Sequence, residues 1–268
     1  MTDNVPEDAP WDVDIRIDTP LAAHAPIEPR AAVADINQDG GRVWIGSQDP
    51  FFVRDFLGDR LGFGDDDLTI LPMRTGGGFG GKAIPLAEIE AAALSLAAGR
   101  PVKVEWTRAH ESSLAYHRPA TSQWVRAQML ATKVQDWSHR MASGHVIYSS
   151  AVLPPWMQAL TDLIGDDGAA RNLATPYVIG ARSIGYDLDR LPIRTAAWRG
   201  LGAGPNTLAS EIAMEATAGE ARVDPVDFRL SHIRDDRLKT VLSATRELAG
   251  TASHKGRGVG CGIYKGVS

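Results

Sequence analysis

The sequence holds a single cysteine, Cys261, and this scarcity excludes several kinds of site. One thiol cannot form a disulfide within the chain, and it cannot supply the ligands of a thiolate zinc site or of a cysteine-bound iron–sulfur cluster. The histidines are scattered without metal-ligand spacing such as H-x-x-x-H, so we expect no metal held directly by this chain. Any redox centre must come from a cofactor or a partner.

An excess of positive charge and long apolar runs are also lacking. The formal net charge of -5 argues against a nucleic-acid partner, because such surfaces gather Lys and Arg to displace phosphate counterions. No stretch is long enough to span a bilayer, and the start MTDNVPEDAPWDVDI lacks the basic residues and apolar run of a secretory signal. We expect a cytoplasmic protein, with a periplasmic location as the alternative if a longer parent carries an export signal.

The remaining composition, with 44% hydrophobic residues, 23% charged residues and 27 glycines, is that of an ordinary globular protein. Asp49 can cap a helix that has Pro50 in its first position and runs through Leu61. The other expected elements are extended chain over residues 1–30, strands at 41–46, 68–73, 101–106, 122–137 and 145–152, strand and loop over 177–195, and helices at 85–99, 205–218 and 235–248. Because strands and helices do not alternate strictly, the sequence predicts an α+β fold in one domain.

The run Gly76–Lys82, GGGFGGK, lies between a predicted strand and a predicted helix. Glycines around Phe79 leave little bulk, so backbone N–H groups can cradle an anion, and a tight turn is the alternative. The spacing also fits the G-x-x-x-x-G-K of a nucleotide-binding P-loop. However, Ala83 stands where a P-loop has the hydroxyl that ligates magnesium, so the nucleotide binder is the weaker alternative.

The phrase Thr75–Lys82 resembles the glycine loop of molybdenum hydroxylases, the family of xanthine dehydrogenase, aldehyde oxidase, carbon monoxide dehydrogenase and isoquinoline oxidoreductase. Further similar phrases occur before and after this loop, in the family's order. They are HAPIEP at 24–29, VWIGSQDP at 43–50, GRPVKV at 99–104, TR at 107–108, AWRGLGA at 197–203, SE at 210–211 and VDPVDFR at 223–229. The resemblance covers about residues 18 to 266 and is closest to bacterial isoquinoline- or nicotinate-type oxidoreductases and aldehyde dehydrogenases. It implies a mixed-sheet molybdopterin-cofactor-binding domain of the xanthine-oxidase type.

The resemblance also implies a cofactor and partners. Members hold molybdenum in a pterin cofactor, either molybdopterin or its cytosine dinucleotide form, and hydroxylate an aldehyde or aromatic N-heterocycle with oxygen from water. The electrons leave toward iron–sulfur clusters, so a small [2Fe-2S] subunit is an expected partner and a cytochrome or flavin subunit a further optional one.

The implied cofactor contacts are Gly77, Gly78, Phe79, Gly80 and Gly81 of the loop, Arg199 and Gly200 from the opposite side, and Gln48. The implied substrate pocket contains Ala83, Trp198 and Leu201. Each of these residues also has a structural alternative. Arg199 could form an ion pair within the protein, Trp198 and Leu201 could belong to the core, and Gln48 could be a turn residue before the helix.

Three departures from the family pattern narrow this interpretation. Ala83 replaces the glutamate of purine-oxidising members and argues against a purine substrate. Ala22 stands where many members have a glutamine near an oxo ligand, so that contact is in doubt. Leu201 replaces an aromatic residue that stacks on flat substrates.

The family's catalytic glutamate lies in a Gly-x-Gly-Glu segment of a second cofactor-binding domain, and this sequence contains no such segment. We therefore expect no catalytic residue in this chain. The expected division is an N-terminal extension at 1–17, the first cofactor-binding domain at 18–256 and the start of the second at 257–268. The isolated chain is expected to be inactive and to need the remainder of the large subunit or a second chain. The alternative is a non-catalytic remnant or assembly protein with this fold.

Overall fold

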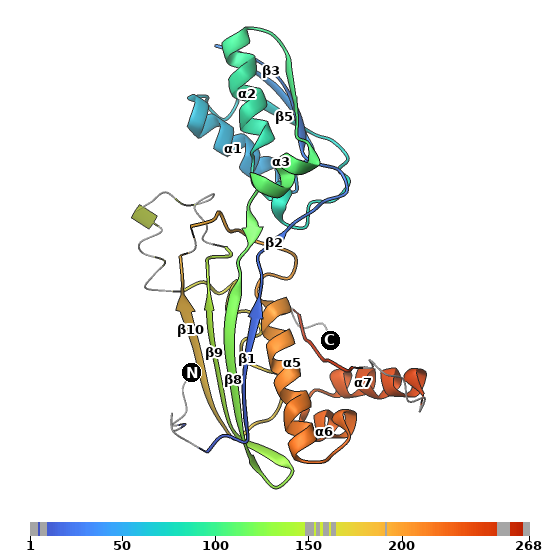
Figure 1. The fold of residues 1–268 in the computed structure, drawn as a ribbon. Helices are drawn as coiled ribbons and strands as arrows, with labels where there is room; N and C mark the ends of the chain where they lie inside the picture. Colours follow the sequence, from blue (N-terminus) through green and yellow to red (C-terminus); the bar gives the residue numbers. More distant parts are fainter. Residues whose placement is uncertain are drawn as a thin grey trace.

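The computed structural model contains two four-stranded sheets in two lobes, which meet where the short strands β2 and β7 pair (Figure 1). It describes residues 5, 10–147, 153, 156–157, 161, 165–190, 192–250 and 258–264. The strands are β1 (Val13–Thr19), β2 (Ala22–Ala23), β3 (Ala31–Asn37), β4 (Gly40–Ile45), β5 (Leu68–Pro72), β6 (Val102–Glu105), β7 (His117–Arg118), β8 (Thr121–Leu130), β9 (Lys133–Ser143) and β10 (Ala181–Leu188). The helices are α1 (Pro50–Leu61), the 3-10 turn η1 (Gly81–Ala83), α2 (Ala87–Ala98), α3 (Arg108–Ser113), α5 (Ala203–Glu220), α6 (Pro225–His232) and α7 (Asp236–Ala249).

The first lobe, at the top of Figure 1, carries the sheet β5-β4-β3-β6 with α1 and α2 packed against one face. Strand β3 pairs antiparallel with β4 and β6, whereas β4 and β5 run parallel. Helix α1 begins and ends as its sequence predicts, because the Asp49 side chain accepts a hydrogen bond from Phe52 N at 3.0 Å and Gly62 ends the helix at φ 81°. Ile45, Val53 and Leu57 fill the core between sheet and helices.

The second lobe carries the sheet β1-β8-β9-β10, with α5 against one face. Strands β1, β8 and β9 are antiparallel neighbours, and β10 runs parallel to β9. Trp137, Tyr177, Met214 and Phe228 are fully buried between this sheet and the helices. Both sheets are therefore mixed, and the α+β class predicted from the sequence is confirmed.

One prediction of local structure is wrong, and a second falls mostly outside the described residues. The segment 122–137 is not one strand: β8 ends at Leu130, a turn with Ala131 at φ 54° follows, and β9 begins at Lys133. The strand predicted at 145–152 is absent from residues 145–147, and residues 148–152 lie outside the described part. Because buried and exposed residues keep alternating on both sides of the β8–β9 turn, the pattern could not mark where the chain reverses.

Other boundaries moved by a few residues. The alanine-rich helix begins at Ala87 and not at Pro85, so its positive end does not open directly onto the glycine loop. Strand β1 begins at Val13, inside the segment predicted as an extension, while the domain division itself stays a prediction. Within the described part of the chain, no helix combines the length and apolar character needed to cross a membrane.

Candidate functional site

The glycine loop after β5 is shaped by close contacts with distant segments. A Cβ atom at Gly78 would lie 2.3 Å from the Gln48 side-chain oxygen, and one at Gly80 would lie 2.4 Å from the carbonyl oxygen of Ala197. Gly80 also has φ 103°, and Phe79 beside it has φ 54°, a conformation that costs a non-glycine residue energy. The run of glycines is therefore required for close approach as well as for the turn.

The two segments that the sequence assigned to opposite sides of one site do meet. The amide of Arg199 donates to the carbonyl oxygen of Phe79 at 2.9 Å, and Ala197 lies against Gly80. Leu201, also at positive φ (57°), continues a tight turn in which its amide bonds to Trp198 O at 2.6 Å. Residues more than a hundred positions apart thus form one surface at the junction of the lobes.

Some amides of this surface are occupied and others are free. Gly76 N donates to Glu28 Oε2 at 2.6 Å, and Gly80 N donates to Gln48 Oε1 at 2.8 Å. The amides that donate to no residue in the described part of the chain include those of Gly77, Gly78, Phe79 and Gly200. Gly78 is buried, whereas Gly77 is part-exposed and Phe79 is exposed, so the amides of Gly77 and Phe79 are the ones that an anion or a ligand oxygen can reach.

The Arg199 side chain adds positive charge to this surface. It is exposed, and its guanidinium makes no hydrogen bond or ion pair with the residues that the structure describes. The sequence-based alternative, an ion pair within the protein, is thus not seen among those residues. A guanidinium of this kind is free to bind an anionic ligand.

Gln48 holds the glycine loop through two hydrogen bonds. Its backbone N–H donates to Lys82 O at 3.1 Å, while its side-chain oxygen holds the Gly80 amide, so both ends of the residue contact the loop. The side chain is exposed, and its own amide nitrogen has no partner in the described residues. A cofactor contact for Gln48 stays a prediction, and this free nitrogen is the group that could make it.

Lys82 does not behave like the lysine of a P-loop. Its side chain is 1% exposed, and Nζ donates to Glu28 Oε2 at 3.0 Å and to Thr75 Oγ1 at 2.8 Å. Hydrogen bonding from Gly76 N and from Lys82 lowers the pKa of Glu28 below its usual value. An internal carboxylate therefore occupies the place of a phosphate, which weighs against the nucleotide-binding alternative.

An apolar cavity of ≈ 210 Å³ lies beside the loop, between the lobes. Ala83 lines it together with Phe52 of α1 and Ala196 and Ala197 of the second segment. The other lining residues are Asp49, Gly80, Ile84, Val146 and Ile147.

The two other predicted pocket residues lie elsewhere. Trp198 donates from its ring nitrogen to Ala23 O at 3.2 Å and has the Arg118 guanidinium 5.5 Å from its ring centre. Leu201 packs against the Met141 cluster of the second lobe. Neither lines this cavity, and their pocket roles stay predictions.

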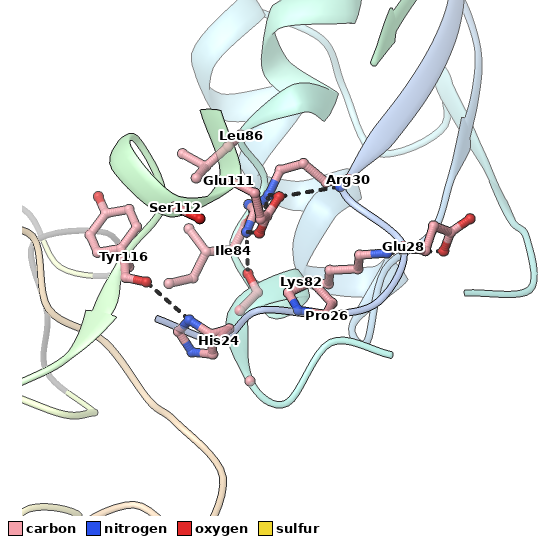
Figure 2. A network of polar contacts seen from close by, with 12 residues as sticks. His24, Pro26, Glu28, Arg30, Lys82, Ile84, Leu86, Glu111, Ser112 and Tyr116 are labelled. Carbon is pink, nitrogen blue, oxygen red and sulfur yellow. Dashed lines mark hydrogen bonds and ion pairs between the residues drawn. The ribbon is translucent and has the colours of Figure 1, made fainter. Parts of the chain in front are cut away.

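A buried ion pair that the sequence did not predict braces the loop. Arg30 and Glu111 are each 2% exposed, and Arg30 Nε and Nη2 each donate to a Glu111 carboxylate oxygen at 3.0 Å (Figure 2). Arg30 also donates to Ile84 O at 3.1 Å and to Gly81 O at 3.3 Å. Burial raises the pKa of Glu111, but the hydrogen bonds and charge of Arg30 outweigh it and leave the pKa below its usual value. The two residues are 81 positions apart, and nothing in the sequence indicated that they pair.

His24 is the second unpredicted contact. In Figure 2 its ring lies below Tyr116, and Nδ1 is 3.0 Å from Tyr116 O while Nε2 is 2.7 Å from Ala197 O. A Cβ at Gly81 would lie 2.7 Å from the ring, so the loop rests on it. Burial lowers the pKa of His24 below its usual value, and the two carbonyl oxygens oppose this effect.

The described residues contain no group of three or more His, Cys, Asp or Glu that could hold a metal ion. A metal at this site would have to be carried by a cofactor. The donors that remain are main-chain amides, the side-chain amide of Gln48 and the Arg199 guanidinium, which suit the oxygen atoms of a bulky bound group.

A family model described as the molybdopterin cofactor-binding domain matches residues 2–233. A nicotinate dehydrogenase chain of Pseudomonas putida is 30% identical over 246 residues, which cover 88% of this chain and 20% of that protein. The beta chain of isoquinoline 1-oxidoreductase from Brevundimonas diminuta is 29% identical, over 82% of this chain and 29% of that protein. The chain therefore spans between a fifth and a third of these relatives.

Solved structures agree in fold. Aldehyde oxidoreductase from Desulfovibrio gigas superposes with a TM-score of 0.72 at 21% identity, over 90% of this chain and 27% of that chain. Quinoline 2-oxidoreductase from Pseudomonas putida gives a TM-score of 0.73 at 20% identity, over 90% and 33%. With the family match over most of its length, the chain belongs to the molybdopterin cofactor-binding domain family of molybdenum hydroxylase large subunits.

Proposed function

We propose that this chain forms one wall of a molybdenum–pterin site in an oxidoreductase that hydroxylates an aldehyde or an aromatic N-heterocycle with oxygen from water. One observation carries the proposal: the bond from Arg199 N to Phe79 O joins the two segments, and beside it the accessible amides of Gly77 and Phe79 donate to no described residue. The names of the relatives, which include nicotinate, isoquinoline and aldehyde oxidoreductases, support the substrate class.

The residues fit the group that the family implies. A pterin cofactor carries oxygen acceptors and phosphate, and the site offers free amides and the Arg199 guanidinium without a competing cluster of metal ligands among the described residues. When bound, the cofactor supplies the two-electron redox chemistry and the activation of water. The same residues suit molybdopterin and its cytosine dinucleotide form, because both carry oxygen acceptors and phosphate.

Within this chain, each group has a limited task. The amides of Gly77, Phe79 and Gly200 donate hydrogen bonds, Arg199 balances negative charge, and the cavity beside Ala83 excludes water from an apolar part of the substrate. Small, uncharged Ala83 in that wall favours an aldehyde, or an aromatic N-heterocycle other than a purine, because the alanine offers no hydrogen bond to the polar purine ring.

The group that removes the proton is proposed to lie outside this chain, in a downstream Gly-x-Gly-Glu segment of a second cofactor-binding domain. Asp49, the carboxylate that lines the cavity, already caps α1 through its contact with Phe52 N. We therefore propose that the chain acts together with the remainder of the large subunit and a [2Fe-2S] partner, and that the isolated chain does not turn over substrate.

The test is metal analysis of the chain co-expressed with its downstream coding region in molybdate-fed cells. The purified complex is expected to contain molybdenum and pterin, and Gly80→Ala is expected to lose most of both, because its Cβ would meet Ala197 O at 2.4 Å. Turnover should fall by about 100-fold, the cost typical of a misplacement of about 1 Å.

The matched control is Gly219→Ala on α5, where an added Cβ meets nothing within 4 Å. This variant should keep its metal and its turnover. A metal-free wild-type complex, or a Gly80→Ala complex with the molybdenum content of the control, would contradict the proposal and favour a remnant that keeps the fold without the cofactor.

A further inference from the structure

His24 joins parts of the chain that are far apart in sequence. Its ring nitrogens face the carbonyl oxygens of Tyr116 and Ala197, which are 92 and 173 positions away. Tyr116 precedes β7 and belongs to the connection between the lobes, whereas Ala197 opens the segment that bonds to Phe79. The ring is buried, 6% exposed, and the Gly81 backbone rests on it.

Counting protons shows what this geometry requires. A carbonyl oxygen only accepts hydrogen bonds, so each ring nitrogen needs a proton to bond to the oxygen it faces. A neutral imidazole has one N–H, and its other nitrogen then directs a lone pair at a carbonyl oxygen. Only the imidazolium form donates to Tyr116 O and Ala197 O at once.

We propose that His24 is a positioning residue that ties the Ala197–Arg199 segment to Tyr116, through the ring on which Gly81 of the glycine loop rests, and that its proton sets how firmly the two are held. In the protonated state both carbonyls are held. In the neutral state one of the two hydrogen bonds is lost, and the ring no longer links Ala197 O to Tyr116 O. The relevance of this latch to catalysis rests on the proposed function, because the cofactor is to lie against both segments.

Charges on the surrounding elements tune this proton. Arg30 disfavours the imidazolium and Glu111 favours it, and the two charges partly cancel because they are paired with each other. Burial adds a further cost to the charged ring. Further charged residues on the elements around the ring are Lys82 on η1, Arg118 on β7, Arg199 beyond Trp198, and Arg194, whose guanidinium lies 5.9 Å from the centre of the Tyr116 ring. Lys82 is turned toward Glu28, so its charge is already balanced.

The test is hydrogen exchange of the wild-type chain between pH 4.5 and 7.5, read by mass spectrometry and corrected for the intrinsic effect of pH. The peptide spanning 195–202 is expected to exchange about threefold to tenfold more slowly in the protonated state of His24, the effect of one net hydrogen bond. The peptide of β8 serves as an internal reference, because it reports any general loosening of the fold by acid.

Two variants decide the cause. His24→Gln offers one amide donor group and no titration near this pH, so the corrected exchange of 195–202 should lose its pH dependence and stay near the neutral level. His110→Gln, at an exposed histidine of α3, should behave like wild type. A flat wild-type profile, or a profile that survives in His24→Gln, would overturn the proposal.

A failure of His24→Gln to fold leaves the wild-type ring itself to be measured. Nitrogen-15 NMR of histidine-labelled chain should then find one buried ring with both nitrogens protonated at the low-pH end and one at the high-pH end, and a ring that never carries two protons would refute the latch. None of these measurements involves the cofactor. They can therefore fail while the metal analysis succeeds, or the reverse.

Discussion

The Arg30–Glu111 pair gives the sharpest prediction for stability. Glu111→Gln keeps the shape of the side chain but removes its charge, and leaves Arg30 buried with an uncompensated positive charge. Removing one partner of a buried ion pair typically costs about 3–5 kcal/mol, because the remaining charge stays desolvated. Here Arg30 retains its bonds to Ile84 O and Gly81 O and a contact 5.0 Å from the Trp106 ring centre, so we expect the lower half of that range, about 3–4 kcal/mol.

Urea unfolding followed by far-ultraviolet circular dichroism measures this loss. For a chain of this size, the melting temperature should fall by roughly 6–16 °C. The matched control is Glu105→Gln, which breaks the exposed pair with Lys103 and should change stability by less than about 1 kcal/mol. A loss below about 1 kcal/mol for Glu111→Gln would refute the reasoning, since the pair would then be screened like a surface one.

Two further predictions concern acid stability and the lysine of the loop. Burial lowers the pKa of His139 to about 4, so the folded state prefers the neutral ring, and stability should be full above about pH 6.5 and fall by about 3 kcal/mol at most toward pH 4; urea midpoints that do not move over this range would contradict it. Glu28→Gln removes the charge that holds Lys82, so an amine-reactive label followed by peptide mapping should modify Lys82 faster than in wild type. Equal labelling rates at Lys82 would show that Thr75 alone retains it.

Local chemistry decided how much of the fold the sequence could predict. Helix α1 has a capping residue and a proline at its start and a glycine directly after its end, and all three act as expected. The turn between β8 and β9 was not predicted, because the residue at positive φ is Ala131 and not a residue type typical of such turns. Strand β3 was not anticipated, because its alternation of small and polar residues, AAVADIN, resembles a loop until β4 pairs with it.

The site divides in the same way. The meeting of the Phe79 and Arg199 segments followed from a resemblance and not from physics, because no local signal links them. Arg30, Glu111 and His24 were missed since each acquires its contact through tertiary packing, at separations where sequence carries no information about distance.

The supports of the glycine loop explain why its sequence alone admitted two interpretations. The same spacing of glycine and lysine would serve a P-loop, and the difference lies in which groups the rest of the fold leaves free. Glu28 takes the Gly76 amide and the Lys82 charge, and Gln48 takes the Gly80 amide, so the lysine and two of the amides that a nucleotide phosphate would need are already bonded. The amides that remain lie in the middle of the loop, against the segment of Arg199, where a ligand must contact both lobes at once. On the proposed function, a ligand held by these amides contacts segments of both lobes, so we expect the residues that join the lobes to affect binding as the glycines do.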